Sequence, residues 1–436
     1  MEHLPPLSIF VDYSGGRSAQ GFNDAVEAFP DRVRAIAFRG PQVYIENILS
    51  AMSRLFCALE HLDVCPSDGS TLRLSTDLSW GYTPSLQYLG VQGANLLSLI
   101  PIFVSAPGLV DLFLGSLSGW GQSQISVFLS HLQQMSCLRQ LELATEYEPS
   151  EGPVLPVQVV TLPRLTSLVL RGRVAHLEGI IAGLVAPSLR HLYIIFYPSP
   201  ETSLLNSPIP HLSRFVRDIE KRFCAFQVGF DRPSYLMHSH SMCPFGFTIT
   251  ANVASVTRMV GALSDKVATV DELILTCLRV LSDLQDFGDS ISWRRFFQLF
   301  PNVKVVRLQR GLECEVARFL RQDKEEPVDL LPVLEEIDLM WFPQSTALKG
   351  TEAASKLKAF EPFLAARQRS GRPNPPTITF DVAGRSAACP IQPLLPYPRF
   401  FSTRGGAEEL CKYLQFTHAL SRPDPGPPAD VPPEPD

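Results

Sequence analysis

Three residues near the middle of the chain have the types and the close spacing that metal binding requires. His238, His240 and Cys243 lie close together, and imidazole and thiolate groups are good ligands of zinc. A fourth ligand could come from His211 or Cys224. The spacing H-x-H-x-x-C matches no common structural zinc pattern. We therefore interpret these side chains as polar residues of a surface loop, and we predict neither a metal site nor a cofactor.

The motifs of nucleotide-binding and hydrolytic enzymes are missing from the sequence. No Gly-Lys pair occurs, which excludes a phosphate-binding loop with its lysine, and neither GxGxxG nor HExxH is present. The segment GSLSG (115–119) has the glycines of a nucleophile elbow, but its central residue is Leu117 instead of a serine. We predict that the protein is not an enzyme. A metal-dependent hydrolase that uses the histidine cluster is the alternative from another class.

A short apolar pattern recurs along the chain at nearly regular intervals. It has an apolar residue, two variable residues, an apolar residue, one variable residue and a last apolar residue, as in LTSLVL (165–170). Its first seven instances are 23 to 29 residues apart and begin at positions 33, 59, 86, 109, 138, 165 and 189. Three more begin at positions 270, 303 and 334. Such a period indicates a repeat protein with one strand per unit.

Four further strands complete the predicted array. The distance of 81 residues from position 189 to position 270 equals three steps of 27, so two degenerate strands are expected in between. FQVGF (226–230) and FGFTIT (245–250) are the candidates. LSIFV (7–11) is the predicted first strand and TITFDV (377–382) the predicted last strand.

Helical patterns separate the strands. They cover residues 42–56, 122–135, 175–185 and 211–223, and they alternate with the strand pattern. One strand and one helix per unit predict an α/β fold, an irregular leucine-rich-repeat solenoid of 12–14 units shaped as a horseshoe. Its parallel sheet would form the concave face and its helices the convex face.

The repeat also predicts which side chains are available to a partner. Because successive residues of a strand point to opposite faces, the apolar positions of the motif point inward and its third and fifth positions face the cavity. Tyrosine and phenylalanine in such places are typical anchors of protein interfaces. The predicted partner-binding residues are His61, Asp63, Tyr88, Asp111, Phe113, Gln140, Glu142, His191, Tyr193, Glu272, Arg307, Glu336 and Asp338. The alternative for any one of them is an ordinary solvated position of the sheet.

Several segments resemble a known family. LPVLEEIDLMW (331–341), KLKAFEPFLAARQRSGRP (356–373), SIFVDYSGG (8–16) and DRVRAIAFRG (31–40) are similar to the F-box/leucine-rich-repeat proteins of mushroom-forming fungi. The resemblance covers roughly residues 5–382. It implies that the concave face selects substrates for a cullin-type ubiquitin ligase. A stand-alone scaffold with no link to ubiquitin is the alternative.

The start of the chain departs from that family. An F-box is a helical module that precedes the repeats and docks the ligase adaptor, whereas LPPL (4–7) leads directly into a predicted strand. We therefore expect no F-box in this chain. The ligase adaptor would be a partner only if an F-box is encoded upstream, and the target protein is unknown.

The end of the chain differs in composition from the repeats. Seven of the residues in 423–436 are proline, and Val431 is the only large apolar residue among them. Such a segment cannot form a core. We expect a solenoid over residues 1–382, an extension with a capping helix over residues 383–420, and a disordered proline-rich tail over residues 421–436.

Charge and cysteine content exclude other classes of protein. The 436 residues carry a net charge of −6, which does not fit a general nucleic-acid binder. No apolar run is long enough to span a membrane. The nine cysteines are scattered without a CxxC pair, as expected for reduced thiols that lie mostly in the core. We therefore expect a cytoplasmic or nuclear protein that contacts neither nucleic acid nor membrane.

Overall fold

The structure is a computed structural model in which strands and helices alternate. It describes residues 7–12, 30–51, 57–67, 70–72, 83–117, 122–145, 158–196, 209–219, 225–229, 245–249, 253–276, 290–309, 312–320, 330–340, 350–369 and 376–381. All of these belong to one compact unit, which comprises Met1–Ser234 and Met242–Cys389. The predicted extension and tail, residues 383–436, lie outside the described residues.

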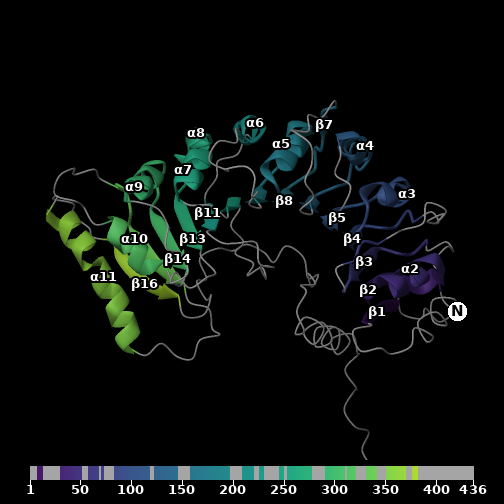
Figure 1. Ribbon diagram of the computed structural model, residues 1–436, viewed down its shortest axis with the longest axis horizontal. Helices are drawn as coiled ribbons and strands as arrows, with labels where there is room; N and C mark the ends of the chain where they lie inside the picture. The colour runs from purple at the N-terminus through teal and green to yellow at the C-terminus, as the bar shows by residue number, and fades with distance from the viewer. Residues whose placement is uncertain are drawn as a thin grey trace, which may run out of the picture. The chain divides into compact units, whose positions relative to one another are not determined.

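Fourteen strands of this unit form one parallel sheet, and Figure 1 shows its strands side by side. Each strand forms parallel backbone hydrogen bonds with its neighbours. The strands are β1 (Leu7–Asp12), β2 (Val33–Gly40), β3 (His61–Pro66), β4 (Tyr88–Gln92), β5 (Asp111–Leu117), β6 (Gln140–Thr145), β8 (Ser167–Gly172), β10 (His191–Phe196), β11 (Ala225–Gly229), β12 (Phe245–Ile249), β13 (Glu272–Thr276), β14 (Val305–Gln309), β15 (Glu336–Met340) and β16 (Thr377–Asp381). All four of the additional predicted strands are present, as β1, β11, β12 and β16.

The helices lie along one side of the strands (Figure 1). They are η1 (Pro30–Arg32), α2 (Gln42–Ala51), η2 (Leu96–Leu99), α3 (Ile100–Ser105), α4 (Gln122–Leu132), α5 (Val174–Ala182), α6 (Pro210–Asp218), α7 (Val253–Gly261), α8 (Ser264–Val267), α9 (Ser290–Gln298), α10 (Glu313–Leu320) and α11 (Gly350–Arg369). The helix predicted over 175–185 ends early, because β9 (Leu184–Val185) pairs with β7 (Val160–Thr161) in a second, two-stranded sheet. No helix of the described part is long and apolar enough to cross a membrane.

The repeated apolar positions form the core, as the motif predicts. In LTSLVL the first residue, Leu165, and the two strand residues Leu168 and Leu170 are fully buried. The corresponding positions of the other nine motif instances are buried too. One unit of this size cannot enclose an apolar core alone, so each unit is stabilised by the neighbours on which it packs. The predicted fold class, an α/β leucine-rich-repeat solenoid, is confirmed.

Polar contacts also join neighbouring helices. The carboxylate of Glu178 on α5 accepts hydrogen bonds of 2.9 Å from the backbone N–H groups of His211 and Leu212 at the start of α6. In return, Arg214 on α6 donates to the carbonyl of Ala182, the last residue of α5, at 3.0 Å. An anion at a helix N-terminus and a cation at a helix C-terminus both oppose the charge of the helix dipole. Each helix of the pair therefore caps the other.

The order of the strands departs from the order of the chain at one place. Along the sheet the sequence of neighbours is β10, β12, β11 and β13, so the two degenerate strands have exchanged places. The register nevertheless continues across them, because Tyr193 is opposite Gly246, Gly246 is opposite Gln227, and Gln227 is opposite Ile274. The exchange therefore does not shift the alternation of the two faces, and each face continues across β12 and β11.

The prediction that the cysteines lie mostly in the core is wrong for those that the structure describes. Cys57 and Cys314 are exposed, Cys65 and Cys137 are half-buried, and none of the four is in a disulfide. The motif explains this outcome. Its apolar positions are filled by aliphatic and aromatic residues, and the described cysteines occupy strand ends, turns and helix surfaces instead.

Candidate functional site

The side chains that point away from the helices form two rows that run across the sheet. Row one contains the residues at the third motif position. From β2 to β10 they are in register: Ala35, His61, Tyr88, Asp111, Gln140, Ser167 and His191. On β13 to β15 the row contains Glu272, Val305 and Glu336. Row two contains the residues at the fifth position, Ala37, Asp63, Gly90, Phe113, Glu142, Val169 and Tyr193, and then Ile274, Arg307 and Asp338. All 13 predicted partner-binding residues are placed on these two rows.

Most of these side chains are half-buried, but three carboxylates are not. Residue exposure is only 7 % for Asp63, 9 % for Asp111 and 5 % for Asp338. The sequence pattern treats all cavity-facing positions alike and did not indicate this difference. Water reaches these three side chains less than the other polar residues of the two rows, so they differ from ordinary solvated residues of a sheet.

His61 and Tyr88 form a stacked pair on β3 and β4. Their ring centroids are 4.1 Å apart, and the ring planes differ by 10°. Burial lowers the pKa of the His61 imidazole from 6.5 to about 4. The imidazole is therefore neutral at neutral pH, and the pair presents two flat, uncharged rings.

Asp63 lies beside this pair, two residues further along β3. Burial raises the pKa of its carboxyl group from 3.8 to about 7, although a hydrogen bond from the Val64 backbone and the charge of Arg39 oppose the rise. The carboxyl group occupies the space above Gly90 on β4. A Cβ atom at Gly90 would lie 2.4 Å from Asp63 Oδ1 and 3.0 Å from the Tyr88 hydroxyl group. Glycine at this position thus allows the carboxyl group to lie over the neighbouring strand.

Cys65 follows on the same face of β3, but its chemistry is not that of a nucleophile. Its Sγ donates a hydrogen bond of 3.2 Å to Oε1 of Gln92. Burial, and then the charge of Asp63, raise the pKa of the thiol to about 11. Because the thiolate is the reactive form, a thiol that stays protonated at neutral pH is inert. His61, Asp63 and Cys65 therefore do not form an activated catalytic group.

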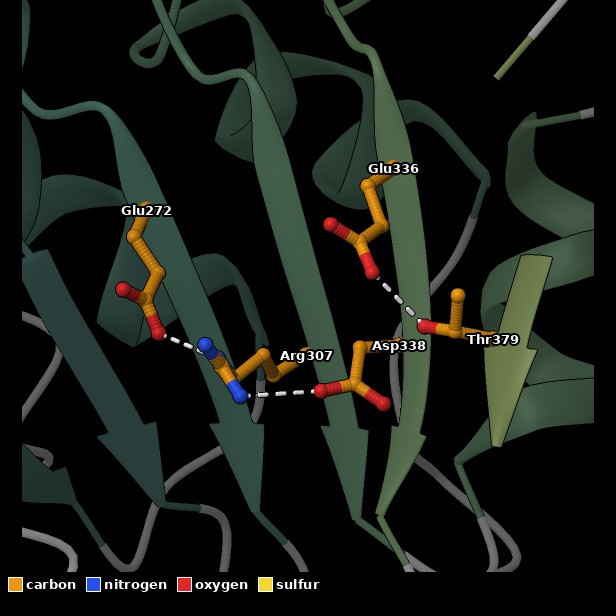
Figure 2. Close-up of polar contacts among 5 residues, drawn as sticks. All are labelled: Glu272, Arg307, Glu336, Asp338 and Thr379. Atoms are coloured by element: carbon orange, nitrogen blue, oxygen red, sulfur yellow. Dashed lines mark hydrogen bonds and ion pairs between the residues drawn. The ribbon is translucent and has the colours of Figure 1, made fainter. Parts of the chain in front are cut away.

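Two neighbouring sets of polar contacts lie on the last four strands of the sheet (Figure 2). Arg307 on β14 forms ion pairs with Glu272 on β13 and with Asp338 on β15, the latter at 2.9 Å between Nη1 and Oδ2. The adjacent carboxylate of Glu336 accepts a hydrogen bond of 2.8 Å from the hydroxyl group of Thr379 on β16. The nearby carboxylates raise the pKa of Arg307 in spite of its partial burial. Thr379 is the one residue of these contacts that the sequence pattern did not indicate.

One more ion pair lies on the same face, near the middle of the sheet. Arg171 on β8 contacts Glu142 on β6, with 2.6 Å between Nη2 and Oε1. Arg171 is two residues further along its strand than Val169 of row two, so it belongs to a third row. The motif ends at its sixth position, and for that reason it does not reach this arginine.

The remaining predicted residues lie on the rows without forming a catalytic cluster. Gln140, His191, Tyr193 and Phe113 are half-buried. Burial, together with the charge of Arg190, lowers the pKa of His191. These side chains supply hydrogen-bonding and aromatic surface, which are the usual components of a binding face.

The candidate zinc ligands are placed only in part. His238, His240, Cys243 and Cys224 lie outside the described residues, and His211 lies at the start of α6. Within the described ranges, no group of three or more His, Cys, Asp or Glu side chains is arranged to hold a metal ion.

The chain was compared with family models, curated proteins and solved structures, and only solved structures match it. No family model matches the chain. No curated protein matches it either. Among solved structures, the chain is similar to the leucine-rich repeat-containing protein LegL7 from Legionella pneumophila, with 13% identity and a TM-score of 0.33 over 82% of this chain and 88% of that chain. The fold assignment made above rests on the 14-stranded sheet and its buried motif positions.

Proposed function

We propose that the protein is a non-enzymatic recognition module that binds a partner protein through rows one and two. The observation that carries this proposal is the unbroken register of both rows from β2 to β10, which lines up rings and charges on the face opposite the helices. Neighbouring strands are about 4.8 Å apart, so 14 strands present a surface roughly 60 Å long. Such a length matches a whole protein domain better than a small molecule.

The aromatic side chains of the rows support the same proposal. Tyr88, Phe113 and Tyr193 are large, half-buried rings on β4, β5 and β10. Rings of this kind add contact area while losing little conformational freedom, and they dominate the binding energy of many interfaces. We expect these three residues to contribute most to partner binding.

A finer role, the selection of substrates for a cullin-type ubiquitin ligase, is proposed from the family resemblance alone. Co-purification of the ligase adaptor with the protein expressed from its own gene, including any sequence upstream of Met1, would support this role. Recovery of a partner without the adaptor would favour the alternative, a stand-alone scaffold.

The experiment that tests the recognition role compares matched variants in affinity capture followed by mass spectrometry. Tyr193→Ala and Phe113→Ala remove rings from the rows, whereas Val104→Ala removes an exposed apolar side chain from α3 on the helix side. We expect partners that the parent and Val104→Ala retain and that both ring variants lose. All variants must first show the thermal unfolding of the parent. If the ring variants fold and capture the same proteins as the parent, the proposed binding face is wrong.

A further inference from the structure

The charge of the rows is strongly one-sided between β3 and β6. The eight positions of rows one and two on these four strands hold three carboxyl groups, Asp63, Asp111 and Glu142, and neither lysine nor arginine. Because the pKa of Asp63 is raised to about 7, this residue carries only part of a charge at neutral pH. The same imbalance continues on β13 to β15, where three carboxylates face Arg307 alone. Six carboxyl groups and one guanidinium group thus lie at the predicted partner-binding positions.

Arginines outside the two rows do not cancel this charge. Arg171 in the third row contacts Glu142 from β8, at one end of the acidic stretch. At the other end of this stretch, the positive charge of Arg39 on β2 lowers the pKa of Asp63 and partly offsets the effect of burial. Asp111 lies between them on β5. With Asp63 left out, the two rows still hold five carboxylates, against the three guanidinium groups of Arg307, Arg39 and Arg171. Partly buried charges are screened less by salt than fully solvated ones.

Charge complementarity limits what can cover this face. A second copy of the chain that presents the same rows would bring carboxylate against carboxylate, which costs binding energy. Residues 423–436 carry four carboxylates and neither lysine nor arginine, so they are repelled as well. A partner surface rich in arginine or lysine is attracted. Arginine suits this face best, because its guanidinium group pairs with carboxylates in two-point contacts and also stacks on aromatic rings.

We propose that the partner docks arginine or lysine side chains onto rows one and two between β3 and β6, where Glu142 lies next to the Phe113 ring. This inference rests on the proposed function, since it names the chemistry of the partner at the same face. In register, Phe113 and Glu142 are direct neighbours on β5 and β6. A cation that reaches the Glu142 carboxylate, which also contacts Arg171, therefore lies one strand away from an aromatic residue.

Phage display tests this proposal. Short random peptides are selected for binding to the immobilised full chain at low ionic strength. Selected peptides are then synthesised, and their affinity for the parent and the variants is measured by fluorescence anisotropy. Asp111→Asn and Glu142→Gln remove one charge each at nearly constant shape. Glu361→Gln, on the exposed side of α11, is the matched control. We expect the selected peptides to be enriched in arginine and lysine. Their affinity for each row variant should be about fivefold lower than for the parent at low salt, and the affinity for the parent should fall by a similar factor at high salt. The control variant should bind them like the parent.

Other results would overturn the proposal in distinguishable ways. Peptides that lose affinity on Phe113→Ala or Tyr193→Ala, but are not basic and ignore the acid variants, would contradict the cationic partner and leave the recognition role standing. Peptides insensitive to every row variant, or the absence of binders, would count against both. The extension contains Arg399 and Arg404, so it is an alternative source of the cations. If the full chain with Arg399→Glu and Arg404→Glu bound the peptides more tightly than the parent, the occupant would be this segment and not a separate partner.

Discussion

The imidazole ring of His61 lies stacked on the phenol ring of Tyr88, with 4.1 Å between ring centroids, at the edge of an acidic stretch of the sheet. Two residues along the same strand, the Asp63 carboxyl group is buried above Gly90. Burial lowers the pKa of His61 to about 4 and raises that of Asp63 to about 7. Both groups thus favour their uncharged forms when the protein is folded, and they respond to pH in opposite directions.

For His61, stability rises with pH in an acid window. Between pH 4 and 6.5 the unfolded chain binds a proton at this histidine and the folded chain does not, so the free energy of unfolding increases with pH. The variant His61→Phe keeps a ring for the stack but cannot titrate. We expect the difference in unfolding free energy between parent and variant, measured with urea at several pH values, to grow in favour of the parent from pH 4 to 6.5. A constant difference across this window would contradict the buried neutral imidazole.

For Asp63 the sign is reversed. Between pH 3.8 and about 7 the folded chain holds a proton that the unfolded chain releases, so the free energy of unfolding decreases as pH rises. Asp63→Asn removes this pH-dependent decrease in unfolding free energy. In the same urea measurements, the variant should gain stability relative to the parent from pH 4 to 7. Asp265→Asn, at an exposed position of α8, serves as control and should follow the parent. A parent that loses no stability relative to Asp63→Asn would show that the carboxyl group is ionised in the folded protein.

Gly90→Ala should destabilise the protein because the new Cβ atom meets Asp63 Oδ1 at 2.4 Å. Displacing the carboxyl group and the Tyr88 ring is expected to cost about 1–3 kcal/mol of unfolding free energy. The second change Asp63→Ala removes the obstacle, so the double variant should recover part of the loss. Gly261→Ala at the end of α7 is the control, since a Cβ atom there meets nothing within 4 Å. Equal effects of the two single alanine variants would rule out the close contact.

Leu168→Asp should unfold the array, whereas Ser167→Asp should not. Leu168 is completely buried in the core, and its neighbour Ser167 points to the opposite face in row one. An unpaired carboxylate in the core costs more than about 3 kcal/mol. Circular dichroism during thermal unfolding compares the two variants with the parent. If Leu168→Asp melted like the parent, the assignment of the two faces would be wrong.

Arg307→Met should destabilise the C-terminal part of the sheet by about 1–3 kcal/mol, because it leaves the buried carboxylate of Asp338 without its cation. Adding Asp338→Asn should restore part of this loss, and a double-mutant cycle in urea then measures the coupling between the two residues. Arg318→Met on α10 breaks a largely exposed pair with Glu315 and should change stability by less than about 1 kcal/mol. Additive effects of Arg307→Met and Asp338→Asn would contradict the ion pair.

The sequence alone predicted the repeat, the parallel sheet and the face on which each strand residue lies. The alternation of side chains along a strand is a local property of the backbone, so the apolar positions of the motif identify the buried face without any knowledge of neighbours. Spacing also identified the first strand, β1, and the degenerate strands β11 and β12, whereas β16 was identified from its strand-like residues. Rows one and two followed directly from the same alternation.

Which strands become neighbours was decided by the tertiary structure. The exchange of β11 and β12 has no local signal, because both segments are equally suited to a parallel sheet and only their packing in the array distinguishes their places. The chain from Glu272 through Arg307 to Asp338 likewise joins residues 35 and 31 positions apart, and it exists only because β13, β14 and β15 pair in register.

Burial of polar groups on the open face depends on the tertiary structure for the same reason. The motif places Asp63 and Asp111 at cavity-facing positions, but the side chains that remove water from them come from adjacent strands. Burial is the largest cause of the raised pKa of Asp63, and the carboxyl group can lie where it is buried because Gly90 on the neighbouring strand has no Cβ atom. Desolvation is a property of a residue's three-dimensional surroundings, whereas side-chain alternation is a property of the strand itself.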